Sequence, residues 1–135
     1  MKKYTIFTIF TLFLAFKMAF NQSVEFNKYN FPTNKEGLST ALGYISAGDK
    51  YYQDGPGVYR LAIDNYLKAD KFNPDNALLN YKLGRCYLDQ NDKSEAIKYL
   101  EKAIKIDPRI SPEMVYNDVN FLLARAYQLD YQFDK

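Results

Sequence analysis

Apolar residues recur three and four positions apart beyond Gly37, which is the pattern of amphipathic helices that bury one side. Three prolines and one glycine-rich turn interrupt the pattern: Pro74, Pro108, Pro112 and Asp54-Gly55-Pro56-Gly57. Helices end near a proline because it lacks the amide donor and clashes with the preceding turn. No useful length of chain alternates between apolar and polar residues as a strand would. The sequence predicts an all-α domain over residues 38–135, after an extended lead-in at 22–37.

Residues 1–21 have a different pattern. Lys2 and Lys3 precede an uncharged run, Tyr4 to Phe16, that is rich in Phe, Ile and Leu. The run is several residues shorter than the ~20 that cross a membrane, and it is typical of a secretory signal peptide. Lys17 interrupts its end and no Ala-x-Ala cleavage site follows, which leaves an uncleaved N-terminal anchor as the alternative. We expect an exported protein without a membrane span in the mature chain.

The remaining chain repeats itself. Small residues and a proline recur at one constant spacing: Ala62, Ala69 and Pro74 return as Ala96, Ala103 and Pro108. A spacing of ~34 residues is that of helical-hairpin repeats. Leu123-Ala124-Arg125-Ala126-Tyr127 resembles Leu83-Gly84-Arg85-Cys86-Tyr87 and begins a third copy. The predicted repeats are about 41–76, 77–110 and 111–135, the last incomplete.

The repeated residues have a physical role in packing. Two antiparallel helices approach closely only where small residues meet, and Gly84 and Ala96 supply such a crossing. Tyr87 and Leu100 fill the space beside it, and Ala103 lets the next repeat pack down. One helix pair cannot bury its own apolar face, so the pairs are expected to stack.

These positions resemble the tetratricopeptide-repeat (TPR) family. The matching residues of the second repeat are Leu83, Gly84, Tyr87, Ala96, Leu100, Ala103 and Pro108; those of the first are Tyr44, Gly48, Tyr51, Ala62, Tyr66, Ala69 and Pro74; those of the third are Ala124 and Tyr127. Asn80 and Lys93 depart from the family pattern, which favours aromatic residues there. The resemblance implies an α-solenoid of antiparallel helix pairs, about two and a half repeats long.

The third repeat is expected to open with a helix over about 112–129, with Ser111 as its N-cap. Phe133 matches the start of a second helix, of which the rest is missing. TPR arrays usually finish with a polar capping helix. We therefore expect the chain to be a fragment of a longer protein, or its last helix to act as a makeshift cap.

The family resemblance also implies a binding groove formed by the first helix of each repeat. The matching positions are Ile45, Asp49, Tyr52, Tyr81, Arg85, Leu88, Asp89, Phe121, Arg125 and Gln128. Tyr, Phe and Arg dominate binding hot spots, and Arg85 and Arg125 could together clamp an acidic segment. The alternative is that Arg85 pairs locally with Asp89. The tyrosines at the repeat positions, Tyr51, Tyr66, Tyr87 and Tyr127, are expected to be core residues.

Composition argues against catalysis. The chain has no His and one Cys, so it lacks the commonest general base, the commonest metal ligand and any thiolate cluster. Cys86 is expected to be a buried filler. Three of the 18 basic residues and none of the 16 acidic ones lie in residues 1–21, so the remainder is nearly neutral and should not attract nucleic acid. We predict no catalytic residue, metal or cofactor.

The sequence predicts a protein–protein interaction scaffold that binds a partner protein or peptide. Two stretches after the signal segment resemble the start of Gram-negative envelope proteins that carry TPRs, a PD40 β-propeller and an OmpA-like domain: residues 47–52 (Ala-Gly-Asp-Lys-Tyr-Tyr) and residues 72–84 (Phe-Asn-Pro-Asp-Asn-Ala-Leu-Leu-Asn-Tyr-Lys-Leu-Gly). That resemblance implies a place in the periplasm or on the periplasmic face of the outer membrane. Two alternatives stay open: a subunit of an enzyme whose catalytic part lies downstream, and a small adaptor that dimerises through its last helix.

Overall fold

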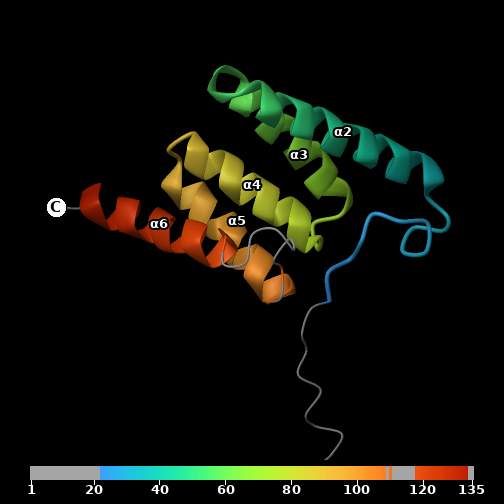
Figure 1. Ribbon diagram of the computed structural model, residues 1–135. Helices are drawn as coiled ribbons and strands as arrows, with labels where there is room; N and C mark the ends of the chain where they lie inside the picture. Colours follow the sequence, from blue (N-terminus) through green and yellow to red (C-terminus); the bar gives the residue numbers. More distant parts are fainter. Residues whose placement is uncertain (1–21, 109, 111–117, 134–135) are drawn as a thin grey trace, which may run out of the picture.

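The computed structural model describes residues 22–108, 110 and 118–133 of the chain. These residues form five α-helices and one 3-10 turn, and none of them lies in a strand, which confirms the predicted all-α class (Figure 1). The elements are α2 (Lys35–Asp54), η1 (Pro56–Val58), α3 (Tyr59–Phe72), α4 (Ala77–Asp89), α5 (Lys93–Ile106) and α6 (Asp118–Phe133).

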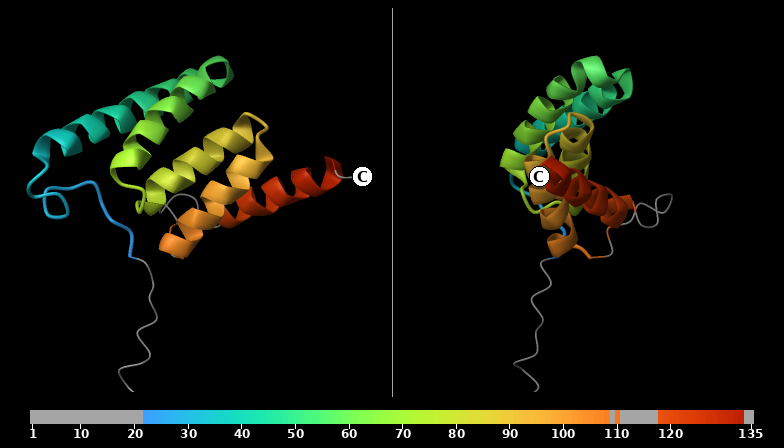
Figure 2. Two further views of the ribbon diagram at one scale, coloured as in Figure 1. Left: turned by 180° about the vertical axis from the view of Figure 1, so that it is seen from behind. Right: turned by 90° about the vertical axis from the view of Figure 1, so that its left-hand side faces the viewer.

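The helices are packed as antiparallel pairs in chain order. Helix α2 pairs with α3 and α4 pairs with α5, while α4 packs against α3 and α6 packs against α5 and α4. Figures 1 and 2 show the pairs following one another in a single direction, with α2 at one end of the stack and α6 at the other. This arrangement is that of TPR-like repeats, in which each pair contacts its neighbours.

Close helix crossings occur at the predicted small residues. A Cβ atom on Gly84 would lie 2.6 Å from Leu100 Cγ, and one on Gly48 would lie 2.5 Å from the Tyr66 ring. Ala62 and Ala96, on the partner helices, are fully buried. The spacing of these small residues along the chain therefore lets the backbone of the first helix contact side chains of the second helix at the centre of each pair.

Helix ends follow from local chemistry. The side chains of Asn34, Asn76 and Asp92 accept hydrogen bonds from the third amide of α2, α4 and α5, and so satisfy donors that the helix leaves unpaired. Helices α3 and α5 stop just before Asn73-Pro74 and Asp107-Pro108, as expected from the prolines. In the turn between α4 and α5, Asn91 adopts a left-handed conformation that asparagine tolerates.

Two predicted boundaries differ from the structure. Helix α2 begins at Lys35, inside the predicted lead-in, because Asn34 supplies an N-cap. Helix α6 continues to Phe133, so this residue ends the first helix of the third repeat and does not begin a second one. The predicted cap at Ser111 and the predicted signal peptide at 1–21 lie outside the described residues. Within the described residues, no helix has both the length and the apolar character needed to cross a membrane.

The core has two clusters, one at each junction between neighbouring pairs. The first joins α2, α3 and α4 around Ile63, Tyr66, Leu79 and Leu83. The second joins α4, α5 and α6 around Tyr81, Leu88, Leu100 and Leu122. Each junction thus buries a surface that one pair alone would leave exposed.

Candidate protein-binding surface

The predicted groove residues do not share one environment. Ile45 and Tyr52 are half-buried against the first core cluster, and Asp49 is half-buried beside them. Arg85, Asp89, Phe121, Arg125 and Gln128 are exposed. The exposed members of the predicted set therefore lie on α4 and α6, and the half-buried members lie on α2.

Two of the predicted groove residues are core residues. Tyr81 and Leu88 are each 5% exposed and pack in the second cluster with Val119, Leu122 and Ala126. Their prediction as groove residues was wrong because α6 lies against this side of α4 and covers it. Phe121 stands at the equivalent place in α6, where no described residue covers it, and it is 64% exposed.

Asp49 is the centre of a polar network that joins three helices. The Tyr66 hydroxyl of α3 donates a hydrogen bond to Asp49 Oδ1 over 2.6 Å, and Lys82 Nζ of α4 lies 2.5 and 2.7 Å from the two carboxylate oxygens. The network holds the carboxylate of Asp49, the charged residue among the predicted groove positions of the first repeat, in a fixed position. Since Lys82 and Asp49 neutralise each other, this part of the surface has little net charge.

A second polar group follows along the same face. The Tyr52 hydroxyl donates to Asp89 Oδ2 over 2.6 Å, and the Arg85 guanidinium lies 5.1 Å from the centre of the Tyr52 ring. The Tyr59 ring stacks on the Tyr52 ring, with 5.2 Å between the two ring centres. Arg85 is thus positioned by an aromatic residue of the preceding repeat, an interaction that the repeat pattern does not predict.

A pocket of about 210 Å³ lies between α2 and α4. Its lining includes Leu42 and Ile45 of α2, Leu78 and Lys82 of α4, and Glu25 and Phe26 of the lead-in. Leu42 and Leu78 are 44% and 42% exposed, and they occupy equivalent places on the two helices. Each lies six residues before the crossing glycine of its helix, Gly48 or Gly84. This shared position is the feature of the sequence from which the two lining leucines could have been predicted.

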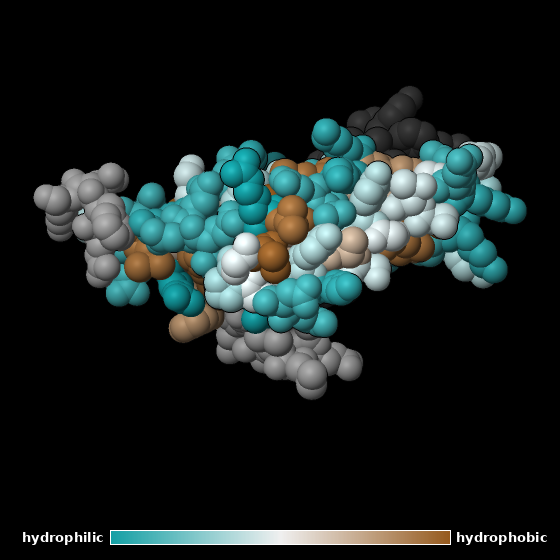
Figure 3. Space-filling view, turned by 90° about the horizontal axis from the view of Figure 1, so that it is seen from above, coloured by the Kyte–Doolittle hydropathy of each residue, from teal (hydrophilic) through white to brown (hydrophobic). Residues whose placement is uncertain are grey.

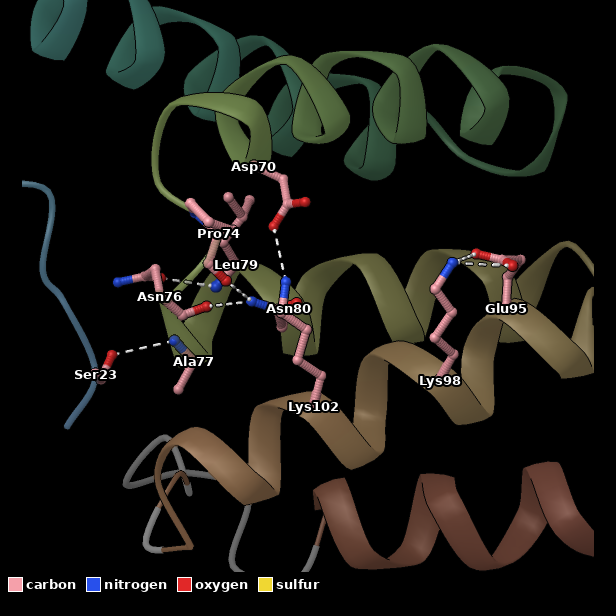
Figure 4. Close-up of polar contacts among 10 residues, drawn as sticks. All are labelled: Ser23, Asp70, Pro74, Asn76, Ala77, Leu79, Asn80, Glu95, Lys98 and Lys102. Carbon is pink, nitrogen blue, oxygen red and sulfur yellow. Dashed lines mark hydrogen bonds and ion pairs between the residues drawn. The ribbon is translucent and has the colours of Figure 1, made fainter. Parts of the chain in front are cut away.

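The lead-in is bound to the turn between α3 and α4. Val24 donates its amide to Asp75 O over 2.8 Å, and its carbonyl accepts from Asn73 Nδ2 and Asn76 Nδ2 at 2.7 and 2.9 Å. Ser23 Oγ accepts from the amide of Ala77, as Figure 4 shows. These bonds hold the lead-in in place directly before Glu25 and Phe26, the two lead-in residues that line the pocket.

Aromatic packing strengthens this attachment. Phe31 lies 4.7 Å from the Phe72 ring and Phe26 lies 6.3 Å from it, so the lead-in covers the end of α3. The sequence pattern predicts only an extended segment at 22–37, without this attachment. The sequence feature that could have indicated this attachment is the presence of Asn73 and Asn76 near Pro74. Both are buried, and a buried amide side chain requires hydrogen-bond partners.

The contacts of Asn80 explain why an asparagine is tolerated at a position where the TPR pattern favours an aromatic residue. It is fully buried, and its Nδ2 donates to Pro74 O and Asn76 O, the backbone of the same turn (Figure 4). An asparagine here thus tightens the turn that binds the lead-in, where an aromatic residue would only fill space.

The predicted structural positions within the helix pairs are buried or half-buried, whereas the two prolines and the two positions in α6 are exposed. Ala69, Leu83 and Ala103 are fully buried. Tyr51 and Tyr87 are half-buried, and Tyr87 stacks on Tyr99 at 5.5 Å. Pro74 and Pro108 lie on the surface just beyond the helix ends.

Ala124 and Tyr127 are exposed, so the expectation that Tyr127 is a core residue was wrong. Helix α6 turns Val119, Leu122 and Ala126 toward the core instead. Among the described residues no second helix covers its other side, which is where Ala124 and Tyr127 lie.

Burial of tyrosines and of the thiol predicts a loss of stability at alkaline pH. Loss of contact with water raises the pKa of Tyr87 and of Cys86 to about 12, and burial followed by the hydrogen bond to Asp49 raises the pKa of Tyr66 further. The unfolded chain releases these protons near pH 9 to 10, before the folded chain does. The contribution of these buried groups to the free energy of unfolding is therefore fully present below about pH 9, and it should be lost as the pH rises toward 12.

Urea denaturation between pH 7 and pH 11 measures this effect, because the midpoint of the transition follows the free energy of unfolding. Tyr66→Phe removes one titrating group and should make the alkaline decline shallower. A midpoint that stays constant up to pH 11 would contradict the burial of these groups.

Polar residues dominate the surface of the part of the chain that the structure describes. Figure 3 shows a mostly hydrophilic face with hydrophobic residues in small, separate patches. Over the part of the chain that the structure describes, no group of three or more His, Cys, Asp or Glu side chains could hold a metal ion. The α2–α4 face combines exposed leucines, a pocket and internally paired charges.

Comparison with known proteins agrees with this architecture. The model of the family described as "Regulator of microtubule dynamics protein 1-3" matches residues 51–127, which is more than half of the chain and includes α3, α4 and α5 entirely. No curated protein matches the chain. The matched region is a TPR-like helical domain in which neighbouring pairs share their cores. The chain belongs to the regulator of microtubule dynamics protein 1-3 family.

Proposed function

We propose that this protein is a non-catalytic scaffold that binds an extended segment of a partner protein across the α2–α4 face. The observation that carries the proposal is the pocket between the two helices, which has an exposed leucine on each side. TPR-like domains are protein-binding scaffolds, and the first helices of successive repeats form their binding surface. The pocket lies between two such helices.

The lining of the pocket defines the chemistry of the partner. Leu42, Ile45 and Leu78 offer apolar surface, while Lys82 and Glu25 place one charge of each sign at its edge. A volume of about 210 Å³ accommodates one large apolar side chain. We expect the partner to insert a residue such as Leu, Met or Phe and to surround it with polar residues, as in other interfaces with an apolar centre and a polar rim.

The setting that we propose is the bacterial cell envelope. Its support is the apolar leader with Lys2 and Lys3 and the resemblance of residues 47–52 to the start of multidomain envelope proteins. In this proposal the chain is part of a larger envelope complex, or of a longer protein with TPR, β-propeller and OmpA-like parts. Cell fractionation of the native host tests the setting separately, since recovery in the cytoplasm would contradict export without affecting the binding surface.

Substitution of the exposed leucines is the test of the binding surface. Leu42→Asp with Leu78→Asp should weaken partner binding at least ~10-fold, because two charges would replace the apolar rim of the pocket. A photo-crosslinking residue placed at Leu78 identifies the partner in cells, and titration calorimetry with the purified partner then measures the loss.

Leu61→Asp is the matched control. Leu61 is 43% exposed, close to the 42% of Leu78, but it lies on α3 and does not line the pocket. Its substitution should leave binding within about twofold of the unmodified chain. Equal crosslinking from Leu61 and Leu78, or binding that survives the double substitution, would exclude the α2–α4 face as the site.

A further inference from the structure

The two charged residues that line the pocket between α2 and α4 differ in how far the chain neutralises them. Lys82 Nζ lies 2.5 and 2.7 Å from the two carboxylate oxygens of Asp49, so its charge is matched. Glu25 is exposed, and within the part of the chain that the structure describes no ion pair joins its carboxylate to a lysine or arginine. The pocket therefore has one negative charge that is not balanced by a cation of the described chain.

Neutral donors hold this carboxylate in place. Ser23 Oγ donates to Glu25 Oε1 over 2.9 Å, and Asn76 Nδ2 donates to Glu25 Oε2 over 3.3 Å. Ser23 Oγ in turn accepts from the amide of Ala77, the first residue of α4 (Figure 4). A helix N-terminus carries about half a positive charge, which is less than the full charge of a carboxylate. A carboxylate has about four acceptor positions, so a fixed Glu25 can still accept from another cation.

We propose that Glu25 makes the pocket selective for a partner segment in which the apolar residue that fills the pocket, the anchor, is next to a lysine or arginine. The proposal rests on the binding surface proposed above and adds the charge of the partner. Glu25 lines the same pocket as Leu42 and Leu78, so its cation must come from a position close to the anchor. An acidic residue at that position would meet a like charge and be rejected.

The other charge at the pocket does not favour an acidic partner to the same extent. To bind Lys82, a partner carboxylate would have to displace Asp49, whose side chain is 38% exposed. Asp49 would then lose its cation while still accepting from Tyr66. A lysine or arginine beside Glu25 displaces no ion pair of the described chain. Charge complementarity therefore points to a basic neighbour of the anchor.

Selection from random peptides displayed on phage tests the proposal, with the full chain as the target. We expect the retained peptides to share an apolar residue with Lys or Arg beside it. Glu25→Lys should reverse the charge preference to Asp or Glu and keep the apolar residue, a result that loosening of the lead-in would not give. Retained peptides that share the apolar residue without a basic neighbour would overturn the charge selectivity and leave the binding surface standing. Retention that survives Leu42→Asp with Leu78→Asp, or no retained peptide at all, would overturn both.

Titration calorimetry with one retained peptide measures the contribution of Glu25. Glu25→Gln should weaken binding about threefold to fivefold, the range of an ion pair at the rim of an interface, and should remove most of its dependence on salt. Glu36→Gln is the matched control, because it removes the same charge from an exposed residue of α2 that does not line this pocket. Equal losses in the two variants would reflect the net charge of the chain and would overturn the proposal.

Photo-crosslinking from position 78 identifies the occupant. With the retained peptide added to the full chain, the crosslinked product should contain the peptide. Mass spectrometry distinguishes the alternatives, since a link to residues 1–21 or to a second copy of the chain gives a different mass. Either of those products in place of the peptide adduct would show that another segment fills the pocket, and would overturn the proposal.

Discussion

Gly84→Leu is expected to lower the free energy of unfolding by about 3 kcal/mol or more, because the second helix pair has no space for a side chain at this position. A Cβ atom there would lie 2.6 Å from Leu100 Cγ and 3.1 Å from the Leu100 backbone nitrogen. The side chain of Leu100 could rotate away, but its backbone could move only if α4 and α5 separated. Urea denaturation followed by circular dichroism measures the loss.

Gly43→Ala is the control for Gly84→Leu, because it changes a helical glycine with open space around it. Apart from its chain neighbours and the backbone of its own helix, no heavy atom lies within 4 Å of a Cβ on Gly43, and its φ is not in the left-handed region. The substitution should stabilise the chain by ~0.5–1 kcal/mol, since glycine is unfavourable inside a helix. If both variants had the stability of the unmodified chain, the tight crossing of α4 and α5 would be refuted.

Asn76→Ala is expected to cost about 2–3 kcal/mol, the second largest effect. Asn76 Oδ1 accepts from the Leu79 amide at the start of α4, and Nδ2 donates to Val24 O in the lead-in. An N-cap contributes ~1 kcal/mol and a hydrogen bond between buried groups contributes ~1 kcal/mol. Asn76 is 3% exposed, so water cannot replace the lost partners without opening the turn.

Asp92→Ala separates the two contributions of Asn76. Asp92 caps α5 through the Glu95 amide and is exposed, so its replacement should cost only ~1 kcal/mol. The excess cost of Asn76→Ala over Asp92→Ala then measures the attachment of the lead-in. Equal costs would mean that the contacts with Val24 contribute nothing to stability.

The helix pairs could be predicted from the sequence because two helix backbones approach closely only where small residues lie between them. Gly48, Gly84, Ala62 and Ala96 therefore specify the register of each pair through their spacing alone. The end of α6 was predicted less well. The family pattern suggested a break before Phe133, whereas no proline or glycine follows Pro112 to stop the helix.

The binding surface was predicted only in part. Tyr81 and Leu88 match groove positions of the family, but burial depends on how closely the next helix packs, and a single repeat does not specify that distance. The leucines of the pocket were not predicted because an apolar residue with helical spacing is normally assigned to the core. The attachment of the lead-in depends on residues about 50 positions away, and no local pattern specifies such a contact.

That distant contact has a consequence for how the chain opens. Repeat arrays usually exchange their amide protons region by region, since each hairpin touches only its neighbours and can fray alone. Here Val24 is held by Asn73, Asp75 and Asn76, so the lead-in cannot leave the turn before α4 without breaking these bonds. The amides of Val24 and Ala77 should therefore exchange with deuterium at one common rate. We therefore expect the lead-in and the turn before α4 to open together.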